Sequence, residues 1–205
     1  MNVLVIPEDF RKDGFILRPI LSARFTKLGT PAIVEVLTDP LIGGLDQALK
    51  REVLEEIVAD NRWKVELFIL CVDRDGEEGR RGVLDGLERH LNTVLGAARV
   101  LAAENAWQEL EVWALAGPKL PPEWRWADIR RERDPKEKYF DPLVAHRRLE
   151  GEAGGGRKRL GIESAENYRR LASRCREDIQ VLETRIRGWI DRRALMSWSE
   201  ALASL

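Results

Sequence analysis

Short apolar segments alternate along the first half of the chain with longer segments whose apolar residues recur at helical spacing. Four apolar segments rich in β-branched residues predict strands: residues 3–6, 32–37, 65–72 and 99–103. The third is apolar on both faces after Glu66, which predicts a central strand. Four further segments predict helices: residues 14–28, 45–60, 77–91 and 106–116. This alternation predicts an α/β fold with an open, mostly parallel sheet flanked by helices.

The second half of the chain breaks this alternation. Residues 117–126 are rich in turn-forming residues, and the glycine-rich residues 151–161 predict a flexible, partly disordered loop. Ser164 is predicted to cap one long amphipathic helix, because apolar residues follow at spacings of three and four from Tyr168 to Trp189. We therefore expect an α/β domain over residues 1–120 and a loop-rich, helical C-terminal extension over residues 121–205 that packs on it.

The composition is that of a globular protein, since 44% of the 205 residues are hydrophobic and 34% are charged. Two cysteines are too few for a disulfide framework or a cysteine-rich zinc site, and two histidines leave little for a histidine-based metal site. The first residues lack the basic lead and cleavage site of a signal peptide, and no apolar run reaches the roughly 18 residues of a membrane helix. We expect a cytoplasmic protein that makes no contact with membranes.

The net charge of −1 is the sum of an acidic first part and a basic second part of the chain. Residues 1–123 carry a net charge of −6, whereas residues 124–205 carry one of +5. Chance and a solvated helical face are one explanation. The alternative is that the acidic part holds cations while the basic part holds phosphates.

Acidic residues follow two of the predicted strands. Glu8 comes after the first strand, and Asp73 and Asp75 come after the central strand, where alternation places their side chains on one side. Glu77 adds a third acid to this D-x-D-x-E segment. Mg²⁺ and Mn²⁺ prefer such carboxylate oxygens, completed by water and substrate phosphate. The same segment is also typical of a turn before a helix, with acidic residues at the positive helix N-terminus.

Other chemistries find little support in the sequence. The phosphate-binding patterns G-x-x-x-x-G-K-[ST] and, after a strand, G-x-G-x-x-G are absent. Most tryptophans are expected in the core or between helices. Trp124 and Trp126, beside Arg125 in a turn-rich segment, are the best candidates for base stacking or a partner interface.

Four short motifs carry a resemblance to a known family. They are Glu8 after the first strand, Val72-Asp73-Arg74-Asp75-Gly76, Gln108-Glu109-Leu110-Glu111-Val112-Trp113, and Asp134-Pro135-Lys136-Glu137. Together they resemble the Toprim domain, and more closely the small stand-alone Toprim-like proteins, similar to OLD nucleases, that are encoded beside ATPases in prokaryotic defence or mobile-element loci. The family usually has glycine after the first-strand glutamate, where this chain has Asp9.

This resemblance implies a Mg²⁺- or Mn²⁺-dependent nuclease acting on DNA or RNA. It also leads us to expect an effector of an anti-phage system with an ATPase partner. Asp73 and Asp75 would bind the metal, Glu77 would be an auxiliary ligand, and Glu8 would be a ligand or general acid/base. The basic part of the chain would hold the nucleic-acid backbone through Lys136, Arg157, Lys158 and Arg159.

Two other functions stay open at this point. The first is a non-catalytic Toprim-fold partner or regulatory subunit of a larger complex. The second is a different phosphotransfer fold, in which Asp9 would be the nucleophile. The heptad-like spacing near the C-terminus also suggests a homo-oligomer.

Overall fold

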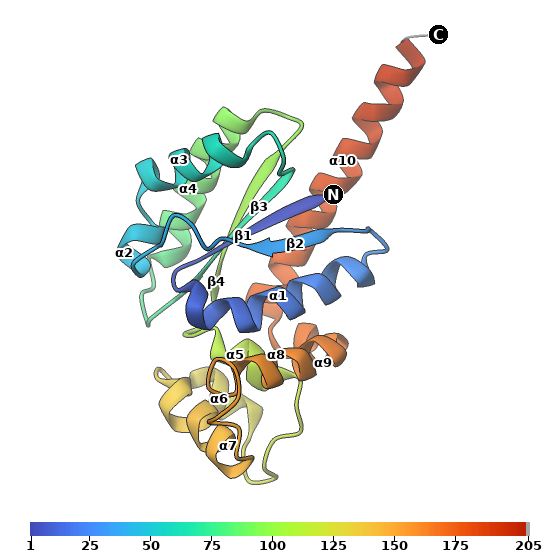
Figure 1. Ribbon diagram of the computed structural model, residues 1–205. Helices are drawn as coiled ribbons and strands as arrows, with labels where there is room; N and C mark the ends of the chain where they lie inside the picture. Colours follow the sequence, from blue (N-terminus) through green and yellow to red (C-terminus); the bar gives the residue numbers. More distant parts are fainter. Residues whose placement is uncertain (204–205) are drawn as a thin grey trace.

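Four parallel strands form an open sheet in the order β2-β1-β3-β4 (Figure 1). The strands are β1 (Asn2–Pro7), β2 (Ile33–Val36), β3 (Leu67–Asp73) and β4 (Val100–Ala106). In this computed structural model residues 1–203 are described, with side chains described through residue 195. The predicted α/β fold with a parallel sheet and a helical C-terminal region is confirmed.

Alternating side chains of the central strands pack into two separate hydrophobic cores, one on each face of the sheet. Val3 and Val5 of β1 point to one face of the sheet, while Leu4 and Ile6 point to the other. Helix α1 (Phe10–Lys27) covers the first face. Helices α2 (Leu45–Ala48), α3 (Arg51–Asn61) and α4 (Arg80–Leu95) cover the second. Both faces of β3 are therefore buried, as its apolar run predicted.

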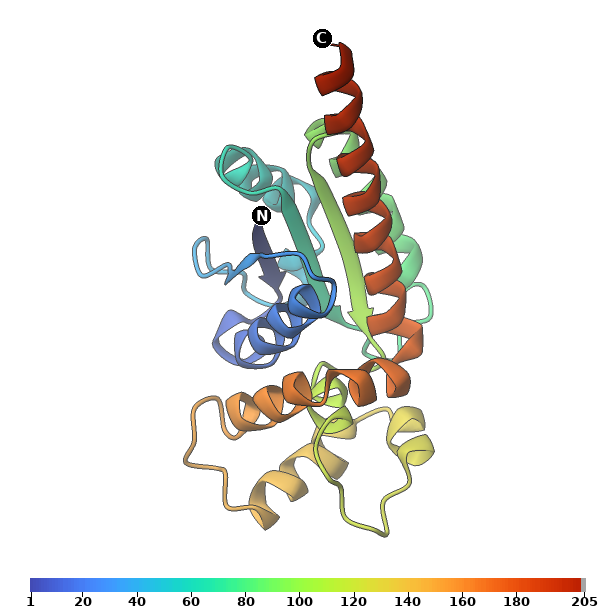
Figure 2. The same ribbon diagram turned by 90° about the vertical axis from the view of Figure 1, so that its right-hand side faces the viewer.

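The chain after β4 folds into a set of short helices below the carboxyl ends of the strands (Figure 2). In chain order these are α5 (Glu111–Ala116), α6 (Trp126–Arg131), the π-helix η1 (Lys136–Phe140), α7 (Asp141–His146), α8 (Arg157–Glu166), α9 (Tyr168–Arg174) and the π-helix η2 (Arg176–Gln180). The long helix α10 (Val181–Ala203) follows and runs beside β4 (Figure 2). Helix α8 packs along α1, and the buried residues of this part join the core on the α1 face of the sheet.

The prediction of one long helix after Ser164 is wrong. Ser164 lies inside α8, where its hydroxyl donates to the carbonyl of Ala114 at 2.8 Å and accepts from the N–H of Gly117 at 3.0 Å. The backbone leaves helical geometry at Asn167 and Cys175, which separate α8, α9 and the segment leading to α10. The apolar residues at the predicted spacing are nevertheless buried, namely Tyr168, Leu171, Cys175, Ile179, Leu182, Ile186 and Trp189. Their spacing predicted which side chains face a core but not the bends between them.

The glycine-rich segment before α8 is a compact turn rather than a loose loop. Gly154, Gly155 and Gly156 all have positive φ, a conformation that glycine adopts without steric cost. A Cβ on Gly154 would lie 2.4 Å from the ring of Phe15, and one on Gly156 would lie 2.8 Å from Val144. The glycines thus allow the turn to pack closely on α1 and α7.

Side chains from α4 and α10 cover the outer edge of β4. Asn92 of α4 exchanges two hydrogen bonds with the backbone of Leu101, at 2.7 and 2.9 Å. The N–H of Ala103 donates to Glu88 at 3.0 Å, and its carbonyl accepts from Arg185 of α10 at 2.7 Å. These contacts prevent another strand from pairing with this edge of the sheet, and they align α10 beside β4 (Figure 2). None of the helices in residues 1–203 is long and apolar enough to span a membrane.

Candidate functional site

The strand order defines a crevice between the carboxyl ends of β1 and β3. The chain leaves β1 for β2 on one side and then crosses to β3 on the other side. Helix α1, which follows β1, lies on one face of the sheet and α4, which follows β3, lies on the other, so the loops after β1 and β3 diverge. Ligands of open parallel sheets bind at such a switch point. Glu8 directly follows β1 and Asp73 is the last residue of β3, so both lie at this crevice.

Glu8 and Asp73 lie next to each other. The backbone N–H of Asp73 donates to Oε2 of Glu8 at 3.3 Å. The N–H of Leu110, before α5, donates to Oδ1 of Asp73 at 2.7 Å. Within the described side chains, Oε1 of Glu8 and Oδ2 of Asp73 accept no hydrogen bond. Each carboxylate is thus oriented through one oxygen and keeps the other for a ligand.

The electrostatic environment of this pair disfavours two negative charges. Burial is the main cause that raises the pKa of Asp73 well above its usual range, and the carboxylates of Glu8, Glu111 and Asp13 raise it further. Burial also raises the pKa of Glu8, with added repulsion from Asp75 and Glu111. A divalent cation would relieve this repulsion, and protonation is the alternative in its absence.

Two acids of this site were not identified as site residues from the sequence. Asp13 lies in the first turn of α1, where burial raises its pKa to about 7. The sequence predicted Asp13 as the helix cap, but Asp9 is the N-cap, and its side chain accepts from the N–H of Arg11. Glu111 begins α5 and is buried. Neither follows a strand directly, so strand-end reasoning could not find them.

Asp75 and Glu77 lie farther out, on the loop between β3 and α4. Asp75 is exposed and has a φ of 54°, so strand alternation ends before it and does not set its direction. Its N–H donates to the carbonyl of Gln108 at 3.1 Å, which holds the loop against the one after β4. Glu77 is also exposed, and its carboxylate accepts from the N–H of Gly79 at 3.0 Å. The carboxylate of Glu77 therefore stabilises the turn before α4.

The four basic residues of the sequence prediction have different environments. Arg157 is buried, and its Nε donates to Glu111 at 3.0 Å. Lys136 contacts Glu137 at 3.0 Å, and its backbone N–H donates to Glu109 at 2.8 Å. Arg159 forms an ion pair with Glu163 at 3.0 Å. Lys158 is exposed and has no carboxylate partner within the described side chains. Of the four, Lys158 is the most available to a phosphate.

The two tryptophans considered for base stacking contact other parts of the chain. The ring of Trp124 packs edge-on against Tyr139, with 5.2 Å between ring centroids. The indole N–H of Trp126 donates to the carbonyl of Arg174 at 3.1 Å, and the guanidinium of Arg174 lies over its ring. Both residues are half-buried and help to join the short helices.

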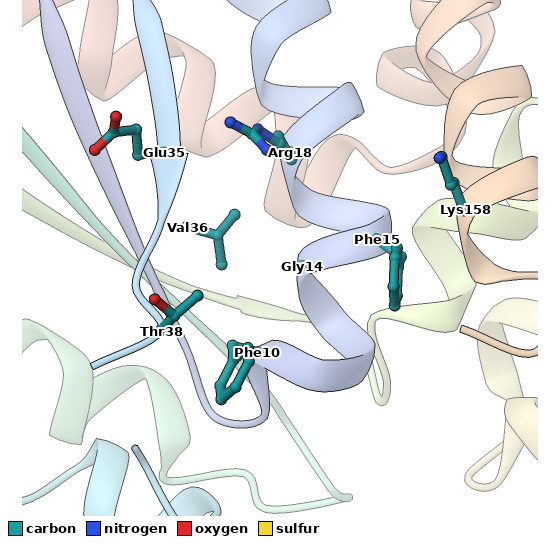
Figure 3. A pocket seen from close by; sticks show the side chains of 8 residues that line it. All are labelled: Phe10, Gly14, Phe15, Arg18, Glu35, Val36, Thr38 and Lys158. Carbon is teal, nitrogen blue, oxygen red and sulfur yellow. The ribbon is translucent and has the colours of Figure 1, made fainter. Parts of the chain in front are cut away.

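A cavity of about 500 Å³ lies between β2, α1 and α8, and the acid in its lining is Glu35 of β2 (Figure 3). Phe10, at the start of α1, and Thr38 lie at one end of it, and Arg18 and Lys158 supply positive charge. Gly14 lies between these residues on α1 and follows Asp13 of the acidic group. The cavity therefore combines the aromatic ring of Phe10 at the start of α1 with the cations Arg18 and Lys158.

The residues at the crevice fit a Mg²⁺ or Mn²⁺ ion in a restricted sense. Among residues 1–195, no three His, Cys, Asp or Glu side chains are arranged to hold a metal ion together. Mg²⁺ needs fewer protein ligands, because one or two carboxylates suffice when water and substrate phosphate complete the shell. Glu8 and Asp73 supply such a pair: each has one free oxygen and a pKa that is raised mainly by burial.

Comparison of the chain with protein-family models, with curated proteins and with solved structures gave no significant match. The chemistry of the crevice is therefore described from its own residues.

Proposed function

We propose that the chain is a Mg²⁺- or Mn²⁺-dependent nuclease of Toprim type that hydrolyses phosphodiester bonds in DNA or RNA. The observation that carries this proposal is the contact between Glu8 and Asp73 at the switch point of the sheet. Burial raises the pKa of both carboxylates, and the charge of Glu8 adds to the rise at Asp73; such electrostatic cost is typical of a functional site. The sheet order and the resemblance of the Asp73-Arg74-Asp75 segment support the same function.

In this proposal Glu8 and Asp73 hold the metal through their free oxygens, and Asp75, whose charge raises the pKa of Glu8, lies near them. The metal would neutralise the phosphate and polarise the bond to be broken. Burial raises the pKa of Glu8, which would also suit it to the alternative role of a general acid/base. Arg18 and Lys158 would contact the backbone of the nucleic acid in the neighbouring cavity. An ATPase partner and a role in anti-phage defence belong to the proposal through the resemblance alone.

The test is cleavage of labelled single-stranded DNA, double-stranded DNA and RNA by the full chain with Mn²⁺ or Mg²⁺. We expect Glu8→Gln and Asp73→Asn to lower the rate at least a hundredfold, because each removes a charge that binds the metal. Asp60→Asn is the matched control, since Asp60 is exposed on α3 and has no ion-pair partner among the described residues. Equal cleavage by all four proteins would refute the assignment of this site.

A non-catalytic Toprim-fold partner subunit is the second candidate. It is favoured by the hydrogen bonds that occupy one oxygen each of Glu8 and Asp73, and by the lack of a three-ligand group among residues 1–195. Calorimetry with Mn²⁺ separates the two functions. Binding that is lost in Asp73→Asn supports the nuclease, whereas no binding by the wild type supports the partner subunit.

A further inference from the structure

A second cavity, of about 570 Å³, lies at the other end of α1 from the acidic crevice. Its walls are the end of α1, helix α9, η2 and the start of α10. Helix α1 has 18 residues, and at about 1.5 Å per residue it separates the two sites by roughly 25 Å. The two sites therefore have no residue in common.

Three cations line this cavity without a carboxylate partner. Lys27, Arg169 and Arg176 form no ion pair with any described side chain, although Arg176 donates to the carbonyl of Ser173 at 3.2 Å. The only acid in the lining is Glu183. Its carboxylate already contacts Arg187 at 3.2 Å and Arg24 at 3.6 Å. The cavity thus has an excess of positive charge.

A buried guanidinium lies behind the cavity wall and adds to this charge. Arg24 is 2% exposed and donates to the carbonyl of Glu183 at 3.0 Å. Its Nε and Nη1 have no hydrogen-bond partner. Arg24 is linked to the cavity by its ion pair with Glu183, which lines the cavity. The hydroxyl of Tyr168, another lining residue, also donates to Glu183, at 3.4 Å. Burying a charge that is incompletely neutralised costs stability, and an anion in the cavity would offset that cost.

We propose that this cavity binds the diphosphate group of a small nucleotide, independently of the acidic crevice. A terminal diphosphate carries about three negative charges near neutral pH, which matches the three unpaired cations. Arginine suits this ligand because its fork of N–H donors matches phosphate oxygens. The volume lies within the roughly 300–1,000 Å³ of small-ligand sites and leaves room for an organic group beside the phosphates. A nucleic-acid backbone spaces single charges along a strand and fits one such cavity less well.

The first experiment measures binding of ADP, pyrophosphate and adenosine to the full chain by calorimetry, in EDTA so that no metal bridges ligand and protein. We expect ADP and pyrophosphate to bind and adenosine not to bind. The double variant Lys27→Ala/Arg176→Ala should lose at least tenfold in affinity for ADP. Arg131→Ala is the matched control, because Arg131 is exposed on α6 and has no ion-pair partner among the described residues. Unchanged circular dichroism would exclude loss of folding as the cause.

A gain in affinity gives a second measurement that misfolding cannot imitate. Gln180 is exposed in the lining of the cavity, and Gln180→Lys adds a fourth cation there. We expect this variant to bind ADP several-fold more tightly, and Asp73→Asn to bind it like the wild type. The proposal is overturned if the wild type does not bind ADP at millimolar concentration, if the double variant binds it equally well, or if adenosine binds as tightly. Tighter binding of single-stranded DNA than of ADP, lost in the double variant, would also overturn it.

Discussion

Glu8 accepts a hydrogen bond from the backbone of Asp73, 65 residues away in the chain, at a distance of 3.3 Å. This contact exists because β1 and β3 are neighbours in the sheet and end at the same edge. It brings together two half-buried carboxylates, and the negative charge of Glu8 raises the pKa of Asp73. The contact therefore has consequences for both stability and ligand binding, which can be measured separately.

Asp73→Asn is expected to make the metal-free protein more stable. Asparagine can keep the hydrogen bond from Leu110 while it removes a buried charge beside Glu8. We expect the free energy of unfolding at pH 7 to rise, because the substitution removes the repulsion from Glu8, Glu111 and Asp13. Urea denaturation in EDTA measures this change. Stability below that of the wild type would contradict it, and Mn²⁺ should stabilise the wild type but not the variant.

Asp13 should make stability depend on pH. Burial raises its pKa from 3.8 to about 7, so between these values the folded chain holds a proton that the unfolded chain releases. The stability from this group is complete below about pH 4 and is lost as pH rises to about 7, by up to about 4 kcal/mol. Denaturation of Asp13→Asn across this range should show a flatter profile. Asp60→Asn should leave the profile unchanged, and an equal slope in all three proteins would refute the prediction.

Arg157 should be needed for folding rather than for binding nucleic acid. Its removal in Arg157→Ala leaves Glu111 buried without a partner, and such a change costs about 3–5 kcal/mol. Lys158→Ala, at the neighbouring exposed position, should change stability by less than about 0.5 kcal/mol. Thermal unfolding compares the two variants. If Arg157→Ala has normal stability but binds nucleic acid more weakly, Arg157 belongs to the nucleic-acid-binding surface and the prediction is wrong.

Gly117 should be irreplaceable because α5 and α8 approach each other there. A Cβ on Gly117 would lie 2.2 Å from the Cα of Ser164. Gly117→Ala is therefore expected to lower the free energy of unfolding by about 3 kcal/mol or more. Gly86→Ala on α4 meets no atom within 4 Å and should raise stability by about 0.5–1 kcal/mol. Equal unfolding midpoints for the two variants would show that the approach is looser than 2.2 Å.

The sequence by itself determined the order of strands and helices in the first half and the positions of Glu8 and Asp73 at strand ends. The predicted helix over residues 45–60 is in fact divided into α2 and α3, and the one predicted from residue 106 begins at Glu111. Both depend on local patterns, since an apolar run such as residues 65–72 fixes a strand wherever that strand lies in the sheet. The same reasoning identified the buried residues from Tyr168 to Trp189. It failed where the backbone bends at Asn167 and Cys175, because side-chain spacing is preserved across a change in helix direction.

Only the tertiary structure decided that β3 lies beside β1, and therefore that Glu8 and Asp73 meet. It also brought Asp13 and Glu111 to the site and buried Arg157, which the charge pattern had placed on a nucleic-acid surface. The physical reason is that strand order and the burial of charges depend on packing between segments far apart in the chain. Local periodicity and net charge do not predict those long-range contacts.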